Sequence, residues 1–246
     1  DFKPNIIYHL AAESHVDNSI KTPDNFINTN ILGTYNLLNA SYKYYKKNKN
    51  LKFIHISTDE VYGSLSNKKN KSFTENSKFL PNSPYAASKA SSDLLVRAWN
   101  KTYNLPTIIT NCANNFGPWQ YPEKLIPKII SCCLNNKKIP VYGNGKNLRE
   151  WIFVKEHVNI LIKLSKKGKI GETYNIGSGF EIDNLKLVNK ICEYFDQYYP
   201  KKNSYKKLIT FVKDRPSHDF RYSVNTKKIK KILNYQPPKD FEKNLK

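Results

Sequence analysis

The chain has 246 residues, enough for one α/β domain with a small additional lobe, and its formal net charge is +21. Arg stands only at positions 97, 149, 215 and 221, whereas nucleic-acid binders recruit Arg for bidentate contacts, so a solvated Lys-rich surface explains the charge better than a nucleic-acid site. The 4 cysteines form no C-x-x-C pair and no apolar run approaches the roughly 18 residues of a membrane helix, which favours a cytoplasmic protein with reduced thiols over a zinc-binding, disulfide-bonded or membrane protein.

Predicted strands and helices alternate along the chain, which indicates a parallel doubly wound sheet. The first strand ends near Leu10, and Thr22-Pro23 then supplies an N-cap and first-turn pair for a long helix. Ser83-Pro84 opens a second long helix after a polar loop at 67–71. The predicted strands cover residues 5–10, 51–57, 107–111, 139–142, 151–154, 172–177 and 209–212. The predicted helices cover residues 23–47, 84–103, 122–136, 155–167, 184–199 and 226–234.

Two polar segments stand where chemistry is expected. Thr58, Asp59 and Glu60 follow directly after a buried strand, and sites in open parallel sheets form at the carboxyl ends of strands. Tyr85 and Lys89 are four positions apart on a predicted helix, so they share one face. A cation there can lower the pKa of a phenol from about 10 towards neutrality. We therefore expect Tyr85 to act as a base beside two acids.

These two segments resemble the extended short-chain dehydrogenase/reductase family, and within it the nucleoside-diphosphate-glucose 4,6-dehydratases. Tyr-x-x-x-Lys alone is a weak signal because any helix can carry it, but other matching segments run from near the first residue to about residue 225. They are residues 11–17, 114–118, 123–127, 140–145, 149–151 and 214–219. The resemblance implies an α/β fold with a truncated Rossmann-like doubly wound parallel sheet and a small interleaved C-terminal substrate-binding lobe. It divides the chain into a partial NAD-binding domain at 1–120, to which 151–180 returns, and a mainly sugar-nucleotide-binding lobe at 121–246.

The sequence lacks a glycine-rich phosphate loop. Its 9 glycines complete neither G-x-G-x-x-G nor G-x-x-G-x-x-G, although the family binds the pyrophosphate of NAD on such a loop after its first strand. The resemblance aligns the strand at 5–10 with the fourth strand of the family. Because the chain begins at Asp1 and contains no Met, we expect a longer parent that carries the first three strands. The chain as it stands is then expected to have negligible NAD affinity and no turnover.

The resemblance also implies a reaction and a role for each polar side chain. A nucleoside-diphosphate-glucose is oxidised at C4 by tightly bound NAD, loses water and is reduced at C6, so that NAD is recycled. Tyr85 would take the proton of the 4-hydroxyl, and Lys89 would adjust the phenol and contact the nicotinamide ribose. Thr58 would hydrogen-bond O4, Asp59 would protonate the leaving 6-hydroxyl, and Glu60 would remove the C5 proton.

Further residues match binding positions of the family. Arg149 and Arg215 suit a diphosphate, because planar guanidinium groups chelate phosphate oxygens. Ser217 stands where the family usually has Gly, so a turn with positive φ would be strained there. The expected cofactor contacts are Ala11, Ala12, Glu13, Ser14, His15, Thr29, Tyr85, Lys89 and Asn115. The expected substrate contacts are Ser14, Thr58, Asn114, Lys124, Leu125, Pro140, Val141, Tyr142, Arg149, Asn184, Arg215 and His218.

Plainer interpretations stay open for several of these residues. His15 could be a core histidine, either arginine could form a structural ion pair, and two adjacent acids often only cap a helix. The acids nevertheless favour a dehydratase, since related epimerases and decarboxylases carry small or neutral residues in their place. A UDP-sugar 4-epimerase or decarboxylase, a non-catalytic sugar-nucleotide-binding remnant and a basic nucleic-acid-binding protein are the alternatives. The nucleobase is open between thymidine, the family default, and uridine.

The resemblance finally implies a homodimer. The helices at 23–47 and 84–103 match those that pair in the family, and the second carries an apolar surface. The alternative is that these side chains pack only within the subunit. The residues concerned are Leu94, Leu95, Ala98 and Trp99.

Overall fold

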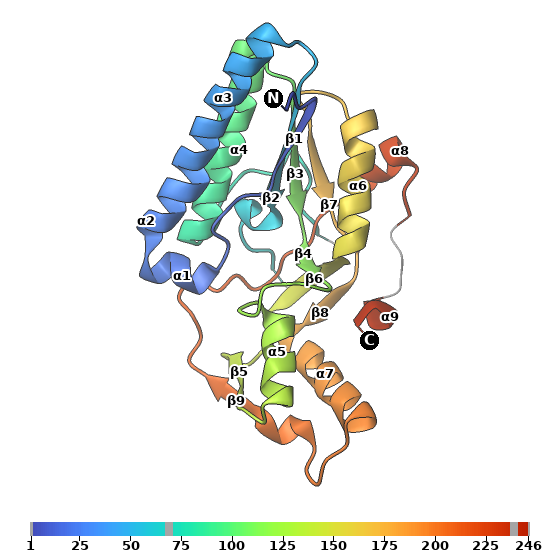
Figure 1. Ribbon diagram of the computed structural model, residues 1–246. Helices are drawn as coiled ribbons and strands as arrows, with labels where there is room; N and C mark the ends of the chain where they lie inside the picture. The colour runs from blue at the N-terminus through green and yellow to red at the C-terminus, as the bar shows by residue number, and fades with distance from the viewer. Residues whose placement is uncertain (1, 67–70, 237–240, 246) are drawn as a thin grey trace.

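A four-stranded parallel sheet frames the larger part of the molecule (Figure 1). The computed structural model describes residues 2–66, 71–236 and 241–245, so most of the predicted loop at 67–71 lies outside the described residues. The strand order is β1-β2-β3-β7, and β1 is therefore an edge strand of the described sheet. The bounds are β1 Ile6–His9, β2 Lys52–Thr58, β3 Thr107–Cys112 and β7 Thr173–Ile176.

Helices cover both faces of this sheet. Successive residues of a strand point to opposite faces, so neighbouring side chains of β2 pack against different helices. Phe53 of β2 packs with Leu38 of α3 and Val96 of α4 on one face. Its neighbour Ile54 packs with Leu161 of α6 and other apolar side chains of α6 and α8 on the opposite face. Figure 1 shows α3 and α4 on the left of the sheet and α6 with α8 on the right. The bounds are α3 Gly33–Lys47, α4 Pro84–Tyr103, α6 Val154–Lys167 and α8 Lys227–Leu233.

A smaller lobe follows at the end of the sheet. A three-stranded sheet of order β4-β6-β8 and a parallel pair β5-β9 pack with α5 and α7 around one apolar core that includes Ile129, Trp151 and Leu187. The bounds are β4 Asn114–Phe116, α5 Leu125–Leu134, β5 Ile139–Tyr142, β6 Leu148–Phe153, β8 Glu181–Asp183, α7 Asn184–Tyr198 and β9 Ile209–Val212. The fold is thus α/β with a parallel sheet, and the chain leaves the sheet at β3 and returns to it at β7.

The predicted helix at 23–47 contains a wide turn. A short α2 (Pro23–Phe26) passes into a π-helical segment η1 (Ile27–Leu32) and only then into α3. The wide turn directs the buried Asn30 inward, where its amide donates to Glu13 O at 3.0 Å and to Ser88 Oγ at 2.8 Å and its oxygen accepts from Glu13 N at 2.9 Å. The segment before Ser14 is held in place in this way.

The strand β6 begins three residues earlier than the predicted strand at 151–154. Its first residues include Arg149 and Glu150, which are charged but only 5 % and 0 % exposed. Glu150 accepts the backbone N–H groups of Gly179 at 2.7 Å and Val224 at 2.9 Å. Because backbone groups satisfy these charges, the polar residues at the start of the strand do not interrupt it.

Short elements make up most of the remaining differences. The helix predicted at 122–136 is confined to α5, and residues 121–124 form turns before it. Elements without a sequence prediction are α1 (Val16–Lys21), α9 (Phe241–Leu245), the 3-10 segments η2 (Asp59–Tyr62) and η3 (Tyr205–Leu208), β4 and β8. Elements this short show no periodicity. Within the described ranges, no helix combines the length and apolarity needed to cross a membrane.

Candidate active site

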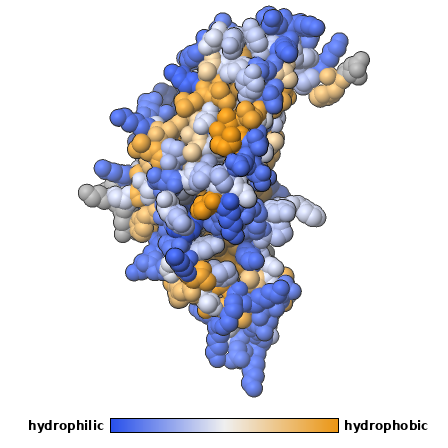
Figure 2. All heavy atoms as spheres, turned by 90° about the vertical axis from the view of Figure 1, so that its left-hand side faces the viewer, coloured by the Kyte–Doolittle hydropathy of each residue, from blue (hydrophilic) through white to orange (hydrophobic). Residues whose placement is uncertain are grey.

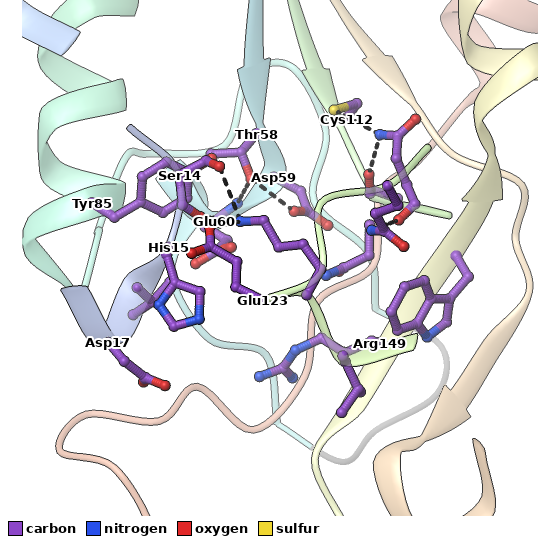
Figure 3. A pocket seen from close by; sticks show the side chains of 18 of the residues that line it. Ser14, His15, Asp17, Thr58, Asp59, Glu60, Tyr85, Cys112, Glu123 and Arg149 are labelled. Atoms are coloured by element: carbon purple, nitrogen blue, oxygen red, sulfur yellow. Dashed lines mark hydrogen bonds and ion pairs between the residues drawn. The ribbon is translucent and has the colours of Figure 1, made fainter. Parts of the chain in front are cut away.

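A cleft of about 630 Å³ opens where β1, β2 and β3 end, between the parallel sheet and the small lobe. Its walls include strand-end residues such as Leu10, Thr58 and Cys112, together with side chains of the small lobe such as Tyr142 and Arg149. Figure 3 shows Ser14, Thr58 and Tyr85 together on one wall and Arg149 across from them. The structure therefore brings together residues from both halves of the chain.

The Thr-Asp-Glu segment forms the 3-10 turn η2 at the end of β2. Thr58 caps this turn, since its Oγ1 accepts the Glu60 N–H at 3.3 Å and donates to Asp59 Oδ1 at 3.3 Å. Burial raises the pKa of the Asp59 carboxyl well above its usual range, and the charge of Glu60 raises it further. Burial also raises the pKa of Glu60, but the nearby Arg215 and Arg149 oppose the shift. Burial thus favours the protonated form of both carboxyls, and Arg149 opposes this at each of them.

Tyr85 and Lys89 lie in the first turns of α4, which Ser83 caps by accepting the Ala86 N–H at 3.1 Å. The expected lowering of the phenol pKa is wrong for this structure, because burial and then the charge of Glu60 raise the pKa of Tyr85 well above its usual value. The Lys89 ammonium donates to Ile56 O at 2.9 Å. Burial lowers the pKa of Lys89.

A buried polar network that the sequence analysis did not predict supports these residues from below. Asp93, one turn after Lys89 on α4, accepts Asn111 Nδ2 at 2.9 Å and lies 3.2 Å from His55 Nε2. Asn111 also donates to Thr58 O at 3.3 Å, and its Oδ1 accepts the Tyr62 hydroxyl at 3.3 Å. The network fixes the Thr-Asp-Glu turn relative to the helix that carries Tyr85 and Lys89.

The expected cofactor residues divide into two groups. Ala12, Ser14, His15 and Asn115 line the cleft, whereas Ala11, Glu13 and Thr29 do not. The backbone of Glu13 is bound by Asn30, and Thr29 lies on the π-helical segment. Asn115 is oriented from behind by His157, whose Nδ1 lies 2.9 Å from the amide oxygen. Ala12, Ser14, His15 and Asn115 follow the ends of β1 and β3, and the other expected cofactor residues that line the cleft, Tyr85 and Lys89, lie on α4.

All the expected substrate residues line the cleft. Arg149 is already satisfied, because its guanidinium donates to the carbonyls of Leu148 at 2.7 Å, Asp219 at 3.0 Å and Phe220 at 3.3 Å. Lys124 donates to Ser14 O at 2.6 Å and to Ser14 Oγ at 3.0 Å, so it joins the small lobe to the cofactor side. Ser217 has φ 51°, which agrees with the strained turn expected where the family has Gly.

Some residues of the site carried no sequence prediction. Tyr222 donates to Asp219 Oδ2 at 2.5 Å and lies with its hydroxyl 3.4 Å from Glu60 Oε2. Asp17 stands at the rim (Figure 3), and Lys128 and Val188 line the wall. Tyr222 follows His218 by four residues, and Asp17 follows His15 by two. The sequence could have pointed to these residues only through their closeness to segments that match the family.

Buried polar atoms without a partner mark the cleft as a binding site. Within the described part of the chain, seven such side-chain atoms belong to residues that line it. Buried polar groups normally find a partner, so their concentration here indicates that a polar ligand completes them. The atoms are His15 Nδ1, Ser57 Oγ, Asp59 Oδ2, Asn114 Oδ1, Gln120 Oε1, Trp151 Nε1 and Asn184 Oδ1.

Comparisons with known proteins agree with this geometry. The family model described as GDP-mannose 4,6 dehydratase matches residues 1–246. A dTDP-glucose 4,6-dehydratase of Shigella flexneri is 48% identical over 99% of this chain and 71% of its own length. The crystal structure of DesIV, a dTDP-glucose 4,6-dehydratase from Streptomyces venezuelae with NAD bound, superposes with a TM-score of 0.88 at 41% identity and covers 98% of this chain and 70% of that one. A UDP-glucuronic acid 4-epimerase from Bacillus cereus gives a TM-score of 0.85 at 27% identity, over 98% of this chain and 73% of that one.

The fold and site define a nucleotide-sugar-modifying enzyme of the extended short-chain dehydrogenase/reductase class. The chain belongs, within that class, to the family of nucleotide-sugar 4,6-dehydratases. It spans about 70% of the length of the curated relatives that it matches.

Proposed function

We propose that the protein dehydrates dTDP-glucose to a 4-keto-6-deoxy sugar with a recycled NAD. The observation that carries this proposal is the pair of adjacent carboxyls in one cleft with Tyr85. Burial raises the pKa of Asp59 well above its usual range and also raises the pKa of Glu60. Arg149 opposes the rise at both carboxyls, and Arg215 opposes it at Glu60. Loss of water needs one group that donates a proton and another that accepts one. The epimerisation performed by the Bacillus cereus relative needs neither acid, so these residues favour dehydration.

The residues at the end of β1 and β3 fit the nicotinamide end of NAD. Ser14, His15 and Asn115 line the cleft beside Tyr85 and Lys89, and His15 Nδ1 is one of the buried atoms that await a partner within the described residues. When bound there, NAD would take a hydride from C4 of the sugar and later return it to C6. The sequence contains no glycine-rich loop for the pyrophosphate. We therefore expect calorimetry of the 246-residue chain to show no micromolar NAD binding; such binding would mean that the site does not need that loop.

Each catalytic side chain has one proton to handle. Tyr85, once deprotonated, accepts the proton of the sugar 4-hydroxyl, and Thr58 hydrogen-bonds the same oxygen. The ketone formed at C4 acidifies the C5–H bond, and Glu60 accepts that proton and gives a proton back to C5 when the hydride returns to C6. Asp59 gives its proton to the 6-hydroxyl, which leaves as water. Because the pKa of Asp59 is raised by burial, the carboxyl keeps the proton it must deliver.

The test is product analysis with the protein expressed from its complete gene, called the parent here. Incubation with dTDP-glucose should give a 4-keto-6-deoxy sugar by NMR, with no net rise of NADH absorbance. A C4 epimer formed without loss of water would favour the epimerase. Absence of any turnover in a parent that binds NAD would favour the non-catalytic remnant.

We further propose a homodimer through α3 and α4. Figure 2 shows apolar side chains gathered on the face that carries these helices. Leu32, at the end of the π-helical segment η1, is 49% exposed, and Tyr35 of α3 is 42% exposed. Leu94 of α4 is 57% exposed. Leu95 and Trp99 instead pack against the core. Light scattering of the parent at twice the subunit mass supports the dimer, and a monomer contradicts it.

We also place the protein in the cytoplasm. The support is chemical: all four cysteines of the chain are free thiols, as expected for a reducing compartment. Fractionation of cells that express the parent tests this, and recovery outside the cytoplasm would contradict it.

A further inference from the structure

Asp17 joins the two halves of the molecule across the rim of the cleft. It lies in the first turn of α1, near His15 (Figure 3). Its Oδ2 accepts the Tyr142 hydroxyl at 2.8 Å, and its Oδ1 lies 3.5 Å from Arg215 Nη1. These partners are 125 and 198 positions away in the sequence, so a single carboxylate connects three distant segments.

The two partners belong to one packed unit of the small lobe. Tyr142 ends β5, and its ring lies edge-on to His218 with the centroids 6.3 Å apart. His218 Nδ1 in turn lies 2.6 Å from Asp214 Oδ1, which also accepts the Arg215 backbone N–H at 2.9 Å. The residues that Asp17 contacts are therefore linked to each other through His218 and Asp214. A substitution at Asp17 would affect the positions of both Tyr142 and Arg215.

Arg215 is the better placed of the two cleft arginines for an anion. The Arg149 guanidinium donates to three carbonyl groups and is 5% exposed. Among the described residues, the Arg215 guanidinium has one side-chain partner, Asp17. A guanidinium held in one orientation presents its remaining N–H groups to phosphate oxygens without first losing rotamer freedom.

We propose that Asp17 is a positioning residue that orients Arg215 and Tyr142 to bind the nucleoside diphosphate of the substrate. This inference rests on the proposed function. Asp17 does not touch the reacting carbons in this scheme, so it acts on binding and leaves the chemical step alone. Its negative charge would also repel a diphosphate, and the sign of the measured effect therefore decides between positioning and repulsion.

The experiment is calorimetry of dTDP binding to the 246-residue chain and to matched variants. Asp17→Asn keeps the shape of the side chain and removes the charge that holds Arg215. We expect it to weaken dTDP binding about tenfold, which corresponds to about 1.4 kcal/mol. In an Arg215→Gln background the same change should weaken binding less than about twofold, because the Arg215 guanidinium is gone and the amide oxygen of the substituted side chain still accepts the Tyr142 hydroxyl. The control Asp24→Asn removes an exposed acid from the neighbouring α2 and should leave binding unchanged.

Tyr142→Phe supplies an independent arm, since it removes only the hydroxyl that Asp17 accepts, and should weaken dTDP binding by a few fold. In the parent, Asp17→Asn should raise KM about as much as it weakens dTDP binding and leave kcat within about twofold. Tighter or unchanged binding by Asp17→Asn, or an equal effect in the Arg215→Gln background, would overturn the inference. If the unchanged chain binds UDP and not dTDP, the proposed nucleobase is wrong and the variants are compared with UDP. If it binds neither, the proposed nucleotide site and this inference fail together.

Discussion

Replacing Asp93 with alanine should remove the one anion of the network beneath the catalytic residues. Asp93 is 1% exposed, accepts Asn111 Nδ2 at 2.9 Å and lies 3.2 Å from His55 Nε2. It also supports the charge of Lys89, since burial lowers the pKa of that ammonium and the Asp93 carboxylate raises it. Removing this carboxylate leaves the buried Asn111 amide without its charged acceptor and the buried Lys89 without a nearby negative charge, which should cost about 2–3 kcal/mol. Against the roughly 5–15 kcal/mol that stabilises a domain, this is a large fraction.

Urea unfolding of the 246-residue chain measures the effect. Asp93→Ala should lower the free energy of unfolding by about 2–3 kcal/mol, and Asp93→Asn, which keeps an oxygen for Asn111, by about 1 kcal/mol. The pKa of Lys89 is already lowered in the folded chain and would fall further in the alanine variant. A neutral amine then forms at lower pH in the variant than in the unchanged chain. The difference in stability should therefore shrink as pH rises through the folded-state pKa values of Lys89, which lie below the ordinary lysine value of about 10.4. A loss below about 1 kcal/mol at pH 7 for Asp93→Ala, or one that grows with pH, would refute this account of the network.

Three further predictions concern single side chains. Tyr85→Phe in the parent should slow oxidation at C4 by about 10²–10⁴-fold, the usual effect of a lost general base, and pre-steady-state NADH absorbance measures it. Glu60→Gln should abolish exchange of the C5 proton with deuterium while oxidation at C4 persists; turnover at the unchanged rate would assign the C5 base elsewhere. His157→Asn should make the 246-residue chain less sensitive to acid. Burial lowers the pKa of His157 from 6.5 to about 4, so the unfolded state binds the proton first and stability is lost as pH falls below about 6.5. This site should account for about 2 kcal/mol of the loss between pH 7 and pH 5 in thermal or urea unfolding, and equal pH profiles for the two chains would contradict the assignment.

Local patterns predicted what depends on local chemistry. The apolar run that becomes β2 and the polar Thr58, Asp59 and Glu60 at its end follow directly from strand periodicity and from where parallel strands terminate. The four-residue spacing placed Tyr85 and Lys89 on one face of α4. It did not predict the pKa of Tyr85, because that value depends on burial and on Glu60, which approaches from another element.

The sequence did not predict contacts between segments that lie far apart in the chain. In the sequence, Arg149 and Glu150 look like surface charges. They can be buried in a strand because residues 179 and 219–224 supply carbonyl and N–H groups as their hydrogen-bond partners. Asp17 and Tyr222 join the site through partners far away in the chain. A pattern that spans a few residues carries no information about such partners.

The π-helical segment Ile27–Leu32 accommodates one residue more than a regular α-helix would at this place. A wide turn holds that extra residue at the same rise, so the helix on either side keeps its rotational phase. Deleting one residue from this segment would therefore convert it into an α-turn with α2 and α3 still in phase. Phe26 would keep its place edge-on to Tyr85 at 6.2 Å, but Asn30 would lose the bulge that directs it to the backbone of Glu13. The number of residues in this helix is thus as constrained as their identity, because the segment before Ser14 depends on a residue count set outside the cleft.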